Sequence, residues 1–67
     1  MLTKKQRAEL VKDGCMSLAK AADFTDLSVE MLYAAMVRGE LRYIKKGRRR
    51  LIPRAGLIEW LGQGIKD

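Results

Sequence analysis

Apolar and small residues recur at helical spacing in two adjacent stretches near the middle of the chain. Residues 18–24 read LAKAADF and place Ala21 and Ala22 where another helix can approach closely. Residues 29–38 read VEMLYAAMVR, and their spacing predicts an inward apolar stripe made of Leu32, Ala35 and Met36. Two short helices joined by three or four residues are the pattern of a helix-turn-helix.

Capping residues delimit these two predicted helices. Ser17 and Ser28 each precede one of them, and a serine hydroxyl there accepts a hydrogen bond from a first-turn N–H. Asp26 stands in the turn, where aspartate tolerates the left-handed conformation better than most residues other than glycine. Gly39 ends the second helix. Together these signals predict a helix-turn-helix over residues 16–39.

A further helix is predicted before this unit, over residues 1–14. Thr3 and Gln6 have the spacing of a capping box at its start. The helix is expected to run through Asp13 and to stop at Gly14. Its thin apolar face consists of Leu2, Leu10 and Val11.

The pattern becomes strand-like after the second helix of the predicted helix-turn-helix. Residues 41–44 and 50–52 read as two strands, and Lys46-Gly47 supplies a turn between them. We therefore predict a β-hairpin over residues 41–52. A hairpin in this place is the wing of a winged helix.

The chain ends with a predicted helix over residues 53–62 and a tail over residues 63–67. Pro53 suits a first helical turn. The inward residues of this helix are expected to be Leu57, Trp60 and Leu61. A chain of 67 residues has room for one domain. The predicted fold is therefore mainly α with a small β-hairpin, a single winged helix-turn-helix.

Basic residues concentrate on the predicted wing. The net charge is +6, and seven of the fourteen Lys and Arg lie within residues 42–54, which contain no acidic residue. Lysines alone would serve to protect an exposed strand edge, but three consecutive arginines exceed that need, and arginine fits phosphate and a narrow minor groove better than lysine. Such a patch indicates a polyanionic partner, double-stranded DNA. The expected wing and backbone contacts are Arg38, Arg42, Lys45, Lys46, Arg48, Arg49, Arg50 and Arg54.

The second helix of a helix-turn-helix enters the major groove and presents its N-terminal residues to base edges. The face opposite the apolar stripe holds the expected contact residues Ser28, Val29, Glu30, Tyr33, Ala34 and Val37. This face has no cation, so arginine cannot read guanine from it. This face still offers apolar side chains for thymine methyl groups, one carboxylate that can accept a hydrogen bond from cytosine, and hydroxyls for phosphate. We expect modest discrimination by each monomer, with affinity carried by the wing.

Several residues have a structural interpretation beside a functional one. Tyr33 suits a phosphate contact and a half-buried position almost equally, and Arg38 either complements its helix C-terminus or contacts phosphate. Trp60 is expected to anchor the core. Cys15, the only cysteine, is expected to be a small buried or half-buried apolar residue. Further core residues and gap-fillers are expected at Phe24, Tyr43, Met16, Met31 and Met36.

The composition argues against several other classes of protein. One cysteine and no histidine permit neither an internal disulfide nor a thiolate-rich zinc site. No pair of acidic residues suits general acid–base catalysis, so we expect no enzyme activity, no cofactor and no metal. The chain has no apolar run long enough for a bilayer and no signal-peptide pattern. We expect an intact cytoplasmic protein with no membrane partner.

The segments MSLAKAADF, LSVEMLY and RGELRYIKKGRRRLIPRAGLIEWL follow one another between Met16 and Leu61. On these segments, which cover about two thirds of the chain, it resembles the excisionase-type helix-turn-helix family, a compact relative of MerR-like winged-helix domains. The resemblance implies a small DNA-binding protein, either a phage or plasmid excisionase (a recombination directionality factor) or a small regulator.

The chain departs from this family at four places. Val29 and Ala34 stand where the family often has basic residues, Asp26 replaces a turn glycine, and Thr25 replaces an apolar residue. The first two departures remove the cations by which such a helix reads bases. They reinforce the expectation of weak discrimination per monomer.

Two functions remain open at the level of the sequence. The first is an architectural excisionase that binds adjacent sites near an attachment site, bends DNA and directs an integrase toward excision, with neighbouring copies and the integrase as partners. The alternative is a transcriptional regulator at a promoter operator. A single-stranded nucleic-acid binder fits poorly, because the wing offers only Tyr43 for base stacking.

Overall fold

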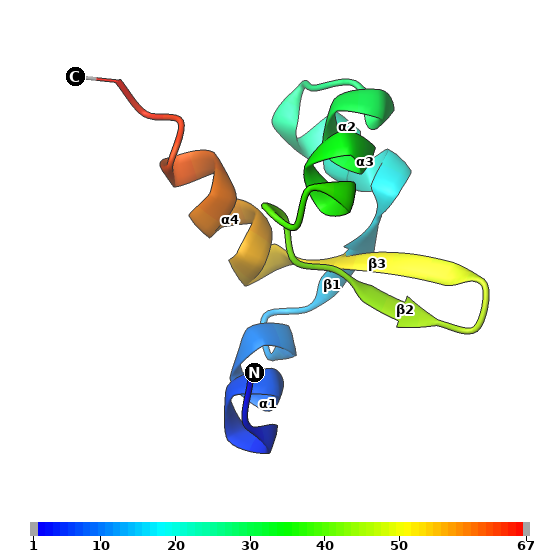
Figure 1. The fold of residues 1–67 in the computed structure, drawn as a ribbon, viewed down its shortest axis with the longest axis vertical. Coiled ribbons are helices and arrows are strands. Elements are labelled where there is room, and N and C mark those ends of the chain that lie inside the picture. Colours follow the sequence, from blue (N-terminus) through cyan, green and yellow to red (C-terminus); the bar gives the residue numbers. More distant parts are fainter. Residues whose placement is uncertain (1, 67) are drawn as a thin grey trace.

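A three-stranded antiparallel sheet lies at the centre of the structure, a computed structural model that describes residues 2–66. In chain order the elements are α1 (Lys4–Val11), β1 (Cys15–Ser17), α2 (Leu18–Thr25), α3 (Val29–Val37), β2 (Ile44–Lys46), β3 (Arg49–Pro53) and α4 (Arg54–Gly62). In Figure 1, α2 and α3 lie together on one side of the sheet, α1 lies on the other, and α4 follows β3 at the end away from the hairpin tip. Among residues 2–66, no helix has the length and apolar character that spanning a membrane requires.

The sheet corrects the prediction of a hairpin alone, because β1 adds a third strand in the order β1-β3-β2. Met16 lies opposite Ile52 on one side of β3, and Ile44 lies opposite Leu51 on the other. Ser17 is both the last residue of β1 and the N-cap of α2. A strand of three residues is too short to show a period-two pattern, so only its capping role was visible in the sequence.

The hairpin begins later than predicted, at Ile44 instead of residue 41. Leu41 is buried from the preceding loop, where its N–H donates to the Ala35 carbonyl oxygen at 3.2 Å. Its apolar character therefore reflects the core and not a strand. The turn consists of Gly47 and Arg48, because Lys46 pairs with Arg49. Gly47 has φ +60°, which suits the first position of a type II′ turn.

The two central helices form as their caps predicted. The Ser17 and Ser28 hydroxyls accept from the N–H groups of Lys20 and Met31 at 3.2 and 3.1 Å. The C-terminus of α3 closes in a Schellman motif around Gly39, whose φ is +78°. In that motif Gly39 N–H donates to the Met36 carbonyl oxygen, and Glu40 N–H donates to that of Ala35.

The turn between α2 and α3 is held by Thr25 and Asp26, two of the four residues at which the chain departs from the pattern of the family that it resembles. Asp26 adopts the left-handed conformation at φ 59° and ψ 28°, as predicted. The Thr25 hydroxyl donates to the Ala21 carbonyl oxygen at 2.8 Å and accepts from Leu27 N–H at 3.3 Å. A polar side chain is thus tolerated here because the helix end and the turn satisfy it.

The core is small, and the predicted stripe of α3 lies in it. Its buried apolar members are Ala21, Leu32, Ala35, Met36, Leu41, Ile52 and Leu57, with Trp60 and Leu61 partly buried against them. Phe24, Met31 and Tyr43 were expected in the core but are 48%, 51% and 44% exposed. Cys15 is also exposed, which corrects its predicted burial. The seven-residue cluster leaves these side chains at its margin, where Phe24 and Tyr43 lie beneath arginines.

The N-terminal helix α1 begins as predicted and ends early. Thr3 N–H donates to Gln6 Oε1 at 2.9 Å, and Gln6 N–H donates to Thr3 Oγ1 at 3.1 Å, which completes the capping box. The helix ends at Val11 instead of Asp13 because the chain turns there to enter β1, with Gly14 at φ +92°. It has no buried residue and contacts α4, where Leu10 lies beside Gly56.

Candidate nucleic-acid interface

The solvent-facing side of α3 carries the residues that the sequence analysis placed in the major groove. Because Leu32, Ala35 and Met36 are buried, the opposite side of this helix is open to solvent. Val37 is 70% exposed, the highest value among the large apolar side chains of α3. Of the six expected contact residues only Ala34 is half-buried; the exposed ones are Ser28, Val29, Glu30, Tyr33 and Val37.

The eight cations expected at the interface are all exposed, but the sheet register sorts those of the hairpin between its two faces. Lys45 lies opposite Arg50, and Lys46 lies opposite Arg49, and directly opposed residues project from the same face. Arg50 shares its face with Ile52, which is buried in the core beneath α2 and α3. Lys45 and Arg50 therefore project on the α3 side, and Lys46 and Arg49 project on the other.

Arg50 connects the hairpin to α3. Its guanidinium carbon lies 5.3 Å from the ring centroid of Tyr33 on α3 and 6.0 Å from that of Tyr43. Both distances are within the range of a cation–π contact. The Arg50 side chain on β3 is therefore within reach of two aromatic rings, one on α3 and one in the loop that leads into β2. The sequence alone shows Arg50 as one of three adjacent cations, and the alternation along residues 50–52 is its only indication of this packing.

The remaining three cations lie outside the hairpin. Arg38 donates to Glu40 at 3.0 Å, and this hydrogen bond lowers the pKa of the Glu40 carboxyl and raises that of the guanidinium. The Arg54 guanidinium lies 5.5 Å from the ring of Phe24 on α2. Arg42 lies beside α4, in a polar hollow that Glu59 also lines. Arg38 and Arg54 thus have partners of their own, a carboxylate and an aromatic ring, and the cations between residues 45 and 50 form the concentrated basic surface.

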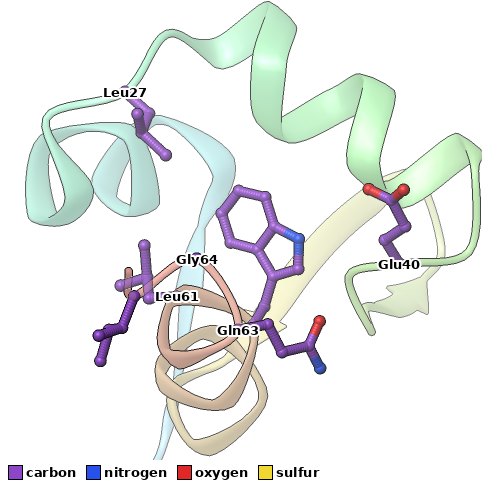
Figure 2. A pocket seen from close by; sticks show the side chains of 7 residues that line it. Leu27, Glu40, Leu61, Gln63 and Gly64 are labelled. Atoms are coloured by element: carbon purple, nitrogen blue, oxygen red, sulfur yellow. The ribbon is translucent and has the colours of Figure 1, made fainter. Parts of the chain in front are cut away.

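A shallow hollow of about 580 Å³ opens between the helix-turn-helix and the C-terminal end of α4. Figure 2 shows Leu27 and Glu40 on opposite sides of the view, with Leu61 and Gln63 of the α4 region below them. Its single carboxylate is the one that accepts from Arg38. Within residues 2–66, no group of three acidic, histidine or cysteine side chains suits a metal ion. With Glu40 as the one acidic residue among its described lining, the hollow has no pair of carboxylates for general acid–base chemistry.

Comparison with known proteins bears on the region from β1 to the end of α4. A protein-family model described as a helix-turn-helix domain matches residues 15–64. No curated protein and no solved structure matches the chain. The matched region contains α3 and the hairpin, and it leaves α1 outside.

Proposed function

The chain belongs to the helix-turn-helix domain family, which makes it a small DNA-binding protein, and we propose that it acts as an architectural excisionase. In this role, copies bind adjacent sites near an attachment site of a phage or other mobile element and bend the DNA. The bent complex then directs an integrase toward excision.

One observation carries the DNA-binding geometry: the exposed side of α3 and the basic hairpin meet at the Arg50–Tyr33 contact of 5.3 Å. A helix presented beside a basic hairpin supports insertion of α3 into the major groove. The hairpin then lies over the adjacent backbone or minor groove, where arginine is favoured. In this arrangement the two surfaces bind one duplex together.

The residues divide by the chemistry that each one offers to DNA. Glu30 can accept a hydrogen bond from cytosine, and apolar side chains can contact thymine methyl groups. Ser28 and Tyr33 have hydroxyls for phosphate. The proposed methyl contacts are Val29, Ala34 and Val37. The proposed wing and backbone contacts are Lys45, Lys46, Arg48 and Arg49 on the hairpin, with Arg38, Arg42 and Arg54 flanking it.

The apolar and acidic character of this α3 face favours an architectural role. A helix that makes few base-specific hydrogen bonds discriminates poorly, yet its sites compete with the whole genome. Adjacent copies multiply weak preferences, and head-to-tail contacts can continue along a duplex without closing into a dimer. A promoter-bound regulator is the second candidate, and it would act at a single operator.

Gel shifts on duplexes with one, two and four sites test this proposal. We expect stepwise complexes in which later copies bind more tightly than the first. Removing residues 1–13, which lie outside the family match and include no described buried residue, should reduce this cooperativity more than the single-site affinity. Circular dichroism of the truncated protein checks that the remainder folds. Equal and independent affinities at every site would leave a one-site regulator instead.

Substitutions on α3 test whether this helix reads bases. We expect Glu30→Gln and Val29→Ala to change which sequences are selected from a random library while leaving affinity for nonspecific DNA almost unchanged, because base contacts specify and phosphate contacts position. A single lost base contact changes discrimination at its base pair by about 1–3 kcal/mol. An equal loss of affinity for all sequences would show that α3 does not read them.

A further inference from the structure

Arg50 differs from its neighbours in the arginine run because it is packed against aromatic rings. Arg48 lies in the two-residue turn, and Arg49 projects from the opposite face of β3. Arg50 alone among these three has aromatic contacts, with Tyr33 and Tyr43. The three adjacent arginines therefore occupy three different environments, and equal roles for them are not expected.

The two tyrosines belong to different structural parts. Tyr33 projects from the middle of α3, and Tyr43 lies in the loop that leads into β2. Each ring is partly exposed, 43% for Tyr33 and 44% for Tyr43. A planar guanidinium can lie against aromatic faces while its N–H groups remain free at the edge. Arg50 thus bridges the helix and the base of the hairpin.

This bridge matters because the outer part of the hairpin has few other supports. Residues 45–50 are all exposed. None of the side-chain hydrogen bonds or ion pairs within the described residues joins the hairpin to α3. Without the Arg50 contact, the hairpin is attached to the rest of the protein only through the pairing of β3 with β1 and through Ile52 in the core. The angle between the hairpin and α3 is then less restricted.

We propose, on the basis of the proposed DNA-binding function, that Arg50 is a positioning residue that fixes the angle between the wing and α3. Tyr33 and Tyr43 hold its guanidinium, and the fixed angle lets one duplex meet both surfaces at once. Arg50 determines specificity through this geometry, whereas Arg48 and Arg49 supply attraction to phosphate. A mobile wing still attracts DNA but no longer aligns α3 with its bases.

Nuclear magnetic resonance of the DNA-free protein tests the contact itself. Ring currents of the two tyrosines should shift the side-chain proton resonances of Arg50 upfield relative to those of Arg49, which projects from the other face. Tyr33→Phe keeps the ring and should keep most of the shift, and Tyr33→Leu should lose a large part of it. Arg50 resonances that match those of Arg49 in the unmodified protein would overturn the proposal.

DNA binding tests the consequence, with Arg50→Lys compared with Arg49→Lys. Lysine keeps the charge but lacks the planar guanidinium. We expect Arg50→Lys to lower affinity for the specific site roughly fivefold, as the loss of a contact of this kind implies, with nonspecific affinity and salt dependence unchanged. Arg49→Lys keeps the charge that attracts phosphate and should change specific and nonspecific affinity by the same factor, without a selective loss at the specific site. Equal behaviour of the two lysine variants would make Arg50 an ordinary phosphate contact and overturn the proposal.

Tyr33 variants complete the test, because a positioning role requires the ring and not the hydroxyl. Tyr33→Phe keeps the ring and removes only the hydroxyl proposed for phosphate, so any loss of affinity should be equal for specific and nonspecific DNA. Tyr33→Leu should in addition show the loss of specific affinity that is expected of Arg50→Lys. The double variant Arg50→Lys/Tyr33→Leu should bind no more weakly than Tyr33→Leu alone, since both substitutions remove the same contact. Additive losses, or a Tyr33→Phe loss equal to that of Tyr33→Leu, would contradict the proposal. If the unmodified protein bound no duplex at all, the proposed function itself would fail, a result distinct from any of these.

Discussion

Replacing Arg48, Arg49 and Arg50 together with alanine is expected to weaken binding to every DNA sequence, by at least about tenfold at physiological salt, because charge-assisted contacts to phosphate are among the strongest hydrogen bonds. The salt dependence should flatten as well. Each lost phosphate contact lowers the slope of log affinity against log salt by about 0.9. If Arg50 positions the wing and only the other two contact phosphate, the slope should fall by about 1.8.

A matched triple variant controls for the loss of net charge. Lys4, Lys5 and Arg7 lie on α1, all exposed, and their replacement by alanine removes the same three charges elsewhere. Fluorescence anisotropy titrations at several salt concentrations give both slopes. A wing variant with an unchanged slope would place the hairpin outside the interface. Equal losses in the two triple variants would show that net charge, and not the wing, attracts DNA.

The helix-turn-helix was predictable because its signals are local. Ser17 and Ser28 satisfy N–H groups within three residues of themselves, and Asp26 and Gly39 adopt the left-handed conformations that their residue types favour. The buried stripe of α3 follows from helical periodicity alone. Such features need no knowledge of the rest of the chain.

The strands were less predictable because their pairing is long-range. β1 spans only Cys15–Ser17 and forms because Ile52 and its neighbours lie opposite it, about thirty-five residues further along the chain. Leu41 was assigned to a strand for its apolar character, although the Schellman turn after α3 carries it into the core. A short apolar segment does not distinguish these two outcomes.

The sequence shows which residues are basic, but the face of the hairpin from which each one projects depends on the fold. Assignment of Arg50 to the α3 side depends on the register of β2 against β3, and a shift of one residue would reverse it. The positions of Phe24 and Tyr43 also depend on long-range packing. Each was expected in the core for its aromatic ring, and each instead lies beneath the guanidinium of an arginine, Arg54 or Arg50.

Replacing Leu32 with alanine is expected to have the largest effect on stability. Leu32 is the largest fully buried side chain of α3, and truncation of such a leucine lowers the free energy of unfolding by about 2–5 kcal/mol. Domains of this size have small cores and little stability in reserve. The variant should therefore be largely unfolded near room temperature, as measured by circular dichroism during urea and thermal denaturation.

Met31→Ala is the matched control, because Met31 precedes Leu32 on the same helix and is 51% exposed. It should lower the free energy of unfolding by less than about 1 kcal/mol. Duplex DNA that binds only the folded state adds stability by mass action, about 2.7 kcal/mol at one hundred times its dissociation constant. Saturating DNA should consequently restore much of the folded signal of Leu32→Ala, because this substitution leaves the exposed side of α3 and the wing unchanged. Equal stability of the two variants would contradict the central place of Leu32 in the core, and a failure of DNA to rescue Leu32→Ala would indicate that the core also sets the geometry of the binding surface.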